Sequence, residues 1–494
     1  MASTLFRTKS IDRLMADSAE TGEHALKRTL GPWALVALGI GAIIGAGIFV
    51  RTAAAIADRA GPSVTIAFIV AGLGCAFAGL CYAEFASMIP VAGSAYTSSY
   101  ATMGEFVAWI IGWDLVLEYA VGAATVSIAW SEYLNNVLRW FGAELPYQWI
   151  HSPFQMDPAT GVHGIVNIPA IFILLLLSLL LIRGTKESAF VNGLIVIVKM
   201  AVVLLVIALG WGFINPANHT PYIPPATDYL SHTGVTHHFG GIMGILGAAG
   251  VVFFAYIGFD AVSTAAQEAK NPKRDMPIGI LVSLVVCTVL YVLFAHVLSG
   301  LAPLADFRDP NLGGEASVAY AIRTYMVGYG WLEKAVTVAI LAGFSSVILV
   351  MLLGQSRVFY SMSRDGLVPK IFSVVHPKFG TPYKSNLLFF VLTAVFGGFV
   401  PGDIVGEMTS IGTLFAFILV CIGVWIMRVR RPDIERGFRV PALPVVATLG
   451  VVVCAAMIFG LGWTNWLRLI AWLAIGMFFY FGYGRKHSVL NKEA

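Results

Sequence analysis

Two apolar segments interrupted by glycines could expose main-chain groups that bind ions or a charged ligand. The first is the run 39–49, with glycines at 39, 41, 45 and 47, and the second is the run 247–260, with glycines at 247, 250 and 258. Each such glycine weakens a helix by about 1 kcal/mol relative to alanine. A helix that breaks in an apolar environment frees N–H groups that can hold an anion and carbonyls that can hold a cation.

The first run allows three interpretations, and one of them fails on spacing alone. A dinucleotide-binding loop needs a third glycine where this chain has Ile44, and it needs a strand, turn and helix around it. A helix-packing contact through Gly41 and Gly45 remains possible, as does an unwound stretch at mid-membrane depth. The second run favours the unwound stretch, because paired interruptions in two corresponding halves of a chain indicate a binding site.

Lys199 is the sharpest ionisable feature of the sequence. It lies about twelve residues from either end of the apolar segment 188–211, which at 1.5 Å per residue is about 18 Å from each end. A lysine side chain cannot reach water over that distance, and its burial costs about 2.5–3.5 kcal/mol. Because a low-dielectric environment disfavours the ammonium form, Lys199 is expected to gain and lose a proton. A permanently charged lysine paired with an acid is the alternative.

Three acids also fall within apolar segments. Asp114 and Glu118 are four residues apart, so they share one face of a helix. Glu118 is the deeper of the two and could either titrate or pair with a cation, whereas Asp114 could lie near a helix end and be hydrated. Asp260 could belong to a proton relay or cap the second interrupted segment. Acids inside a membrane commonly mark ion and proton pathways.

The composition indicates that the helices carrying these residues span a membrane. Of the 494 residues, 58% are hydrophobic and 12% are charged, against about 25% charged in soluble domains. Single-span architectures are excluded, and no basic stripe with interleaved aromatics indicates nucleic-acid binding. The five cysteines lie in apolar runs and predict no disulfide or metal site. Apolar windows predict twelve spans, near 33–52, 63–88, 97–127, 166–182, 188–211, 240–267, 277–300, 331–362, 386–401, 405–428, 441–461 and 464–483.

The predicted architecture is an all-α membrane protein with a 5+5 inverted repeat and two further helices. A transporter core occupies 31–428, with helices 1–5 at about 33–211 and helices 6–10 at about 240–428, and helices 11–12 occupy 429–483. Most of the 31 Lys and Arg residues then fall on one side of the membrane. The positive-inside rule therefore places the tails 1–30 and 484–494 in the cytoplasm, and the first apolar run is expected to be retained rather than cleaved.

Six motifs in order along the chain resemble the amino acid-polyamine-organocation (APC) superfamily. They are 41–49, 81–84, 90–96, 271–277, 357–366 and 438–444, and the last two look like the cationic amino acid transporter branch, particularly its bacterial members. The match covers almost the whole chain. One departure lies at Gly93-Ser94, where that family often has two glycines. The resemblance implies secondary active transport at the cell membrane, by alternating access around a site between helices 1 and 6.

The resemblance also implies how the substrate is held. The substrate carboxylate should meet the N–H groups of Gly45, Ala46 and Gly47. The ammonium should meet carbonyls of Ile43, Phe254 and Ile257, with Ala255 in the same segment. These groups are common to all amino acids, so they define the substrate class and not its identity. Phe254 also matches an aromatic gate position over the substrate.

The resemblance further implies a role for Lys199. In proton-coupled relatives a lysine at this place occupies the sodium site of sodium-coupled ones, where Ser345 and Ser346 match hydroxyl ligands and carbonyls near Gly41 supply the rest. Met351 could line the pocket floor and limit the size of the substrate side chain, or pack in the core.

We therefore expect a proton-coupled importer of L-amino acids, neutral and/or cationic, with membrane lipids as its other partner. The proton is the expected coupling ion, and neither a cofactor nor a metal is predicted; the sequence carries no signal for an accessory protein or a nucleic acid. A sodium-coupled or uncoupled amino acid exchanger is the alternative. An enzyme is not expected, because His296 is the only histidine within a predicted span and no HExxH motif occurs. A channel would show flux that does not saturate.

Overall fold

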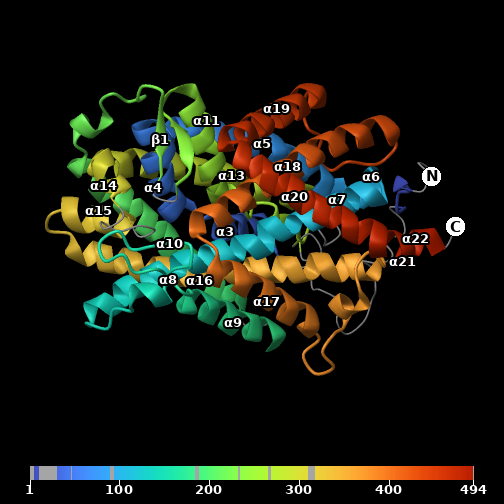
Figure 1. Cartoon of the computed structure of the whole chain (residues 1–494). Helices are drawn as coiled ribbons and strands as arrows, with labels where there is room; N and C mark the ends of the chain where they lie inside the picture. The colour runs from blue at the N-terminus through green and yellow to red at the C-terminus, as the bar shows by residue number, and fades with distance from the viewer. Residues whose placement is uncertain are drawn as a thin grey trace.

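A computed structural model describes residues 5–10, 30–45, 47–88, 94–183, 188–231, 234–264, 269–309 and 317–492. The chain folds into long helices that run roughly alongside one another (Figure 1). Eight helical segments among the described residues are long and apolar enough to cross a membrane, and four further apolar helices are shorter. Two of the short ones, Pro32–Ile43 and Gly241–Tyr256, belong to the two glycine-interrupted segments.

The first glycine-interrupted segment is broken, as the sequence predicts. Helix α3 (Pro32–Ile43) begins with proline in its first turn and ends where Ile44 adopts an extended backbone, with φ −73° and ψ 100°. The chain resumes as a π-helical turn, Gly47–Arg51. It continues through α4 (Thr52–Ala55) toward α5 (Val64–Met88).

The second glycine-interrupted segment is broken as well. Helix α11 (Gly241–Val252) tightens into a 3₁₀ turn at Phe253–Tyr256 and then stops, because Ile257 has an extended backbone with ψ 133°. Gly258 follows in the left-handed region at φ +114°, where glycine is the residue that fits without strain. The short helix α12 (Ala261–Thr264) completes the segment.

The third predicted span, 97–127, is wrong in its limits. The chain forms α6 (Ser94–Thr102), then α7 (Glu105–Val116), a π-helical turn Leu117–Val121 and α8 (Gly122–Trp140). Gly104 separates α6 from α7 at φ +94°, where a side chain would meet the backbone of Phe6. Polar residues such as Ser131 and Asn135 are buried against protein, so an apolar window ends the helix too early.

Eight of the remaining described helices lie close to predicted spans, whereas the short helices α14, α15, α21 and α22 lie outside every predicted span. The remaining helices are α9 (Ile168–Arg183), α10 (Ser188–Gly210), α13 (Pro272–Leu301), α14 (Leu304–Arg308), α15 (Ser317–Tyr325), α16 (Gly330–Arg364), α17 (Tyr383–Phe399), α18 (Gly402–Arg430), α19 (Leu443–Leu461), α20 (Trp463–Phe479), α21 (Arg485–His487) and α22 (Val489–Lys492).

One end of the helix bundle carries a small hairpin that the all-helical prediction did not include. Strands β1 (Thr227–Leu230) and β2 (Thr236–Phe239) pair antiparallel. The guanidinium of Arg308 lies 4.0 Å from the Tyr229 ring centre and 4.3 Å from that of Phe239, and its Nε donates to the carbonyl of Ala57. Burial lowers the pKa of His237 to about 4, so this strand carries a neutral imidazole.

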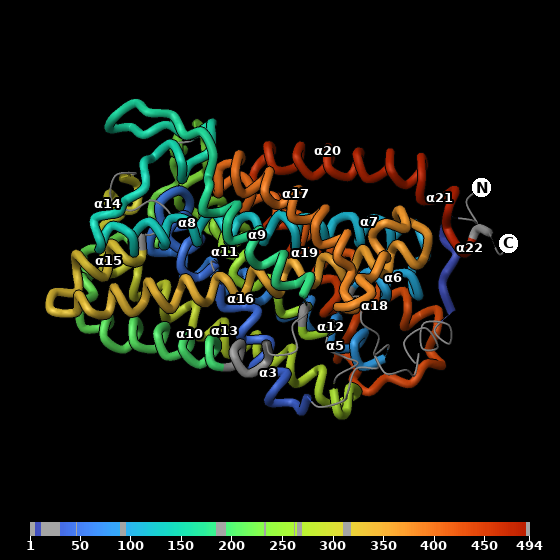
Figure 2. Tube along the Cα trace, turned by 90° about the horizontal axis from the view of Figure 1, so that it is seen from below, coloured from blue at the N-terminus to red at the C-terminus, as the bar shows by residue number. Residues whose placement is uncertain are grey.

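The opposite end of the helix bundle carries both ends of the chain. Residues 5–10 and helix α22 lie close together there (Figure 2), and Arg7 donates to the carbonyl of Leu490 at 3.2 Å. In the same N-terminal segment, the Lys9 ammonium lies 2.9 Å from the carboxylate of Asp365, at the end of α16.

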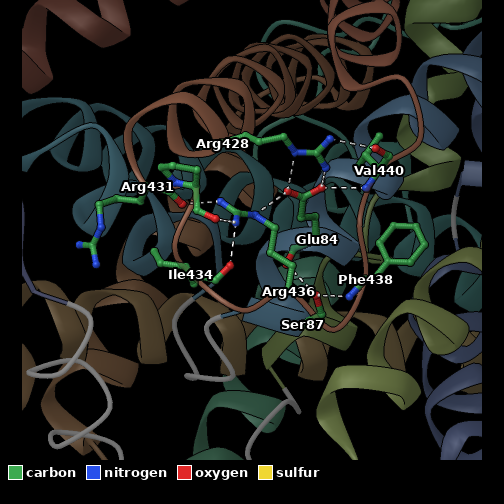
Figure 3. A network of polar contacts seen from close by, with 9 residues as sticks. Glu84, Ser87, Arg428, Arg431, Ile434, Arg436, Phe438 and Val440 are labelled. Atoms are coloured by element: carbon green, nitrogen blue, oxygen red, sulfur yellow. Dashed lines mark hydrogen bonds and ion pairs between the residues drawn. The ribbon is translucent and has the colours of Figure 1, made fainter.

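A buried carboxylate at this same end holds the connection between α18 and α19. Glu84 of α5 receives the guanidinium groups of Arg428 and Arg436 and the main-chain N–H of Val440 (Figure 3). The Arg436 and Glu84 side chains are 2% and 1% exposed, so this pair is desolvated. Ser87, one turn further along α5, accepts from the N–H of Phe438 at 3.1 Å. The segment 431–440 is therefore fastened across the end of α5.

We expect Glu84→Gln to lower stability strongly, because it leaves the buried guanidinium of Arg436 without a counter-charge. Breaking a buried ion pair costs about 3–5 kcal/mol, and the measurement is the thermal unfolding midpoint in detergent. Glu435→Gln is the matched control, since Glu435 pairs with Lys273 where both side chains are more than half exposed; such pairs contribute about 0–1 kcal/mol. Equal losses in the two variants would contradict the buried pair's role.

Candidate functional site

The two broken segments touch each other directly through glycines. A side-chain carbon placed on Gly47 would lie 2.1 Å from the Cα of Ala255, and one placed on Gly258 would lie 2.7 Å from the carbonyl oxygen of Ala42. Neither position has room for any side chain. The close approach brings the main chain of the first break against the main chain of the second, as a site shared by both breaks requires.

Tyr291 of α13 links the two breaks by its hydroxyl. The oxygen lies 2.9 Å from the carbonyl oxygen of Ile43 and 2.8 Å from that of Ala255. A hydroxyl carries one proton, so it can satisfy only one of these two carbonyls at a time. The other carbonyl keeps a lone pair that a substrate ammonium could use.

Lys199 of α10 reaches the first break from the other side. Its ammonium donates to the carbonyl oxygens of Gly41 and Ile44, each at 2.8 Å, and the residue is 2% exposed. Helix α3 ends at Ile43, so these carbonyls are among those that a helix end leaves without an intrahelical partner. Within the ranges that the structure describes, Lys199 forms no ion pair, which disfavours the alternative of a lysine paired with an acid.

Helix α16 contributes one face to the first break. Gly343 packs on the stem of Lys199, and Val347, one turn later, packs against Gly45. Ser346 is three residues from Gly343, so it lies on this same face, and it is buried. Ser345 lies elsewhere: its hydroxyl accepts from the Trp130 indole of α8 at 3.1 Å. The structure therefore brings one of the two predicted serines toward the break.

The buried acids form a second polar group beside the π-helical turn of residues 117–121. Tyr119 donates to the carboxylate of Asp260, which follows the second break. Glu118 is fully buried, and its oxygens reach no hydrogen-bond partner among the described residues. Asp114, four residues before Glu118 on the same chain segment, is buried as well.

The face of α16 that packs against α7 and α8 completes this polar group. Met351 packs against Gly122 and Met362 against Gly112, which places Gln355 between them, level with the π-helical turn. The amide of Gln355 is buried and reaches no hydrogen-bond partner within the described part of the chain. Buried polar atoms without a protein partner commonly hold water or a ligand.

The other predicted binding residues lie within the breaks. Phe254 and Ile257 are buried in the second break, and the N–H of Ile257 donates to the carbonyl of Phe254 at 3.3 Å. Gly45 lies in the bend after α3. Ala46, also predicted to bind the substrate carboxylate, lies outside the described residues.

The fold and this site define a family of membrane transporters. Residues 30–481 match the amino acid permease family, and the chain belongs to it, within the APC superfamily; its members are transporters and not enzymes. The chain is 44% identical to the branched-chain amino acid permease BcaP of Bacillus subtilis, over all of both chains. It is 40% identical to the methylthioribose transporter of the same organism, over 99% of this chain and 100% of that one. It is 33% identical to the vacuolar cationic amino acid transporter 4 of Arabidopsis thaliana, over 87% and 68% of the two chains.

Sequence reasoning missed Tyr291, Gly343 and Tyr119. A tyrosine hydroxyl in the middle of a long apolar helix was the available signal for Tyr291, because a buried hydroxyl needs a partner. Gly343 carried no signal of its own, since a single glycine in a helix is compatible with several kinds of close contact.

We expect Tyr291→Phe to destabilise the protein in the absence of substrate, because it leaves buried carbonyls at both breaks without their donor. Such a loss costs about 1–3 kcal/mol. Saturating amino acid should restore part of the loss, since its ammonium can donate to the carbonyl of Ile43. Thermal unfolding with and without substrate measures both effects.

The matched control is Tyr256→Phe, which also removes a fully buried hydroxyl but one that donates to Phe68 of α5 at 2.9 Å. Its loss of stability should be similar and should not be recovered by substrate. Equal recovery in both variants would show that Tyr291 has no special relation to the ammonium site.

Proposed function

We propose that this amino acid permease imports its substrate together with a proton, by alternating access around the two breaks. The single observation that carries the proposal is the Lys199 ammonium, donating to two carbonyls of the first break. A cation is the natural partner of freed carbonyls, and here a side chain supplies that cation. An ammonium that can lose its proton can switch the strength of this contact, because hydrogen bonds from charged donors are about twice as strong as neutral ones.

The bound amino acid is proposed to lie between the breaks. Its carboxylate would meet N–H groups at Gly45, Ala46 and Gly47, and its ammonium would meet carbonyls of Ile43, Phe254 and Ile257. The contact of Gly47 with Ala255 supports this arrangement, because it brings the main chains of the two breaks within reach of one small molecule. Glu118 and Asp260 are proposed to act in proton transfer, and Met351 and Phe254 to border the pocket.

Aliphatic L-amino acids are the first substrates to test. The likeness to a branched-chain permease supports them, as does the apolar contact of Val347 with Gly45. Cationic amino acids are the next class, supported by the Arabidopsis relative and by the buried acids Glu118 and Asp260. Competition of labelled leucine uptake by each of the twenty amino acids ranks these classes, and the absence of competition by any of them would contradict the proposal.

A second candidate substrate follows from the methylthioribose transporter, which is 40% identical to this chain. Methylthioribose has neither a carboxylate nor an ammonium, so it cannot use the paired main-chain contacts in the same way. Uptake of labelled methylthioribose, measured beside uptake of labelled leucine, separates the two: uptake of methylthioribose without uptake of leucine would favour the second candidate.

The proposed location is the cell membrane, with both chain ends in the cytoplasm. The positive-inside count supports this orientation, and the contact of Arg7 with Leu490 supports a common side for the two ends. The transporter core 31–428, its inverted repeat and the appended helices 429–483 remain the proposed organisation.

We expect Lys199→Ala to abolish substrate accumulation driven by an acid-outside gradient in proteoliposomes, while exchange of substrate at equal pH continues. The physical reason is that the variant loses the group that changes charge, but keeps the main-chain groups that bind the amino acid. Lys334→Ala is the matched control, because Lys334 is an exposed lysine near the start of α16, and it should accumulate substrate as the unmodified protein does.

Two results would contradict proton coupling. One is gradient-driven accumulation that survives in Lys199→Ala. The other is uptake by the unmodified protein that requires sodium at fixed pH, which would favour the sodium-coupled alternative. Exchange without any accumulation would favour the uncoupled exchanger.

A further inference from the structure

The stem of Lys199 lies against a position of α16 that has no side chain. A methyl group placed on Gly343 would lie 2.6 Å from Cδ and 3.1 Å from Cγ of Lys199. Cβ atoms essentially never approach another atom within 3.0 Å, so alanine at this position would displace its neighbour. Gly343 therefore provides the space through which the lysine stem passes.

The displaced neighbour could not move freely. The end of the Lys199 side chain is fixed, because its ammonium donates to the carbonyls of Gly41 and Ile44 at 2.8 Å each. Its Cα belongs to α10, and its middle crosses Gly343 of α16. Contacts with α3, α10 and α16 together thus determine the path of the Lys199 side chain. A shift of Cδ must withdraw the ammonium from α3 or separate α16 from α10.

Among the described residues, α13 brings two titratable side chains, Cys287 and Tyr291, toward the region of Lys199 and the first break. Cys287 is a fully buried thiol and carries no charge, and Tyr291 donates to the carbonyls of Ile43 and Ala255. Helix α3 (Pro32–Ile43) contains no charged residue, and on α16 the nearest charged residues in sequence to Gly343 are Lys334 and Arg357. No acid among the described residues is therefore available there to hold the ammonium: the two carbonyls hold it, and packing at Gly343 sets the path of the stem that carries it.

We propose that Gly343 is a positioning residue for proton coupling: by lacking a side chain, it allows the Lys199 ammonium to reach the carbonyls of the first break. This inference rests on the proposed function, in which Lys199 is the coupling group. Val347, on the same face of α16, packs against Gly45 of that break, so α16 positions both the lysine and the backbone that receives it.

The test is Gly343→Ala in the full-length protein. Accumulation of labelled leucine driven by an acid-outside gradient should fall about 10- to 100-fold, the loss typical when a residue that orients a metal-binding side chain is changed. Exchange at equal pH should persist. The pH dependence of uptake should flatten, a readout that a general packing defect does not alter.

Gly354→Ala is the matched control, because it makes the same change on the same helix. A methyl group there would meet the Tyr119 ring at 3.5 Å, an ordinary contact. Accumulation and stability should both remain close to those of the unmodified protein. An equal loss of accumulation in both alanine variants would overturn the inference.

A double-mutant cycle separates the contact from damage to folding. When Lys199→Ala removes the lysine stem, the methyl group added by Gly343→Ala no longer meets an obstacle. The second change should then cost no further stability, because the methyl group partly fills the space that the stem has left. Non-additivity of this kind is expected for residues in direct contact. Additive losses in the thermal unfolding midpoint would overturn the inference.

The transport results distinguish the two proposals. If Lys199→Ala keeps gradient-driven accumulation, proton coupling through Lys199 is wrong, and the positioning role fails with it. If Lys199→Ala loses accumulation but Gly343→Ala keeps it at the unmodified level, only the positioning role of Gly343 is wrong.

Discussion

The structure depends on one constraint: main-chain groups that leave a helix inside a membrane must find other partners. An unsatisfied carbonyl in hydrocarbon costs several kcal/mol, and the end of α3 exposes several. Lys199 meets two of them, and the hydroxyl of Tyr291 meets a third together with one from the second break. Each partner comes from a different helix, so α10 and α13 both supply donors to the broken backbone.

This constraint explains the distribution of glycines around the site. Glycines within the breaks let two main chains meet, as at Gly47 and Gly258, and a glycine on α16 lets the lysine stem pass between helices. The polar side chains can then be few. The polar contacts at the two breaks are made mainly by peptide groups, to which one ammonium and one phenol donate.

The sequence allowed the breaks and Lys199 to be predicted because both signals are local. Repeated glycines weaken a helix wherever it packs, and a lysine twelve residues from either end of an apolar segment has to be buried. Tyr291 and Gly343 could not be predicted, since their importance depends on which faces of α13 and α16 meet α3 and α10. The limits of α8 were missed for a related reason: its polar residues, such as Ser131, face protein instead of lipid.

The neighbouring chain ends have a practical consequence for reporter design. Arg7 contacts the main chain of Leu490, so fluorophores attached at the two ends would begin within energy-transfer range of each other. Lys9 in the same segment contacts Asp365 at the end of α16. Any rearrangement of α16 that releases this contact would change the transfer efficiency, giving an optical signal of the working cycle in intact cells.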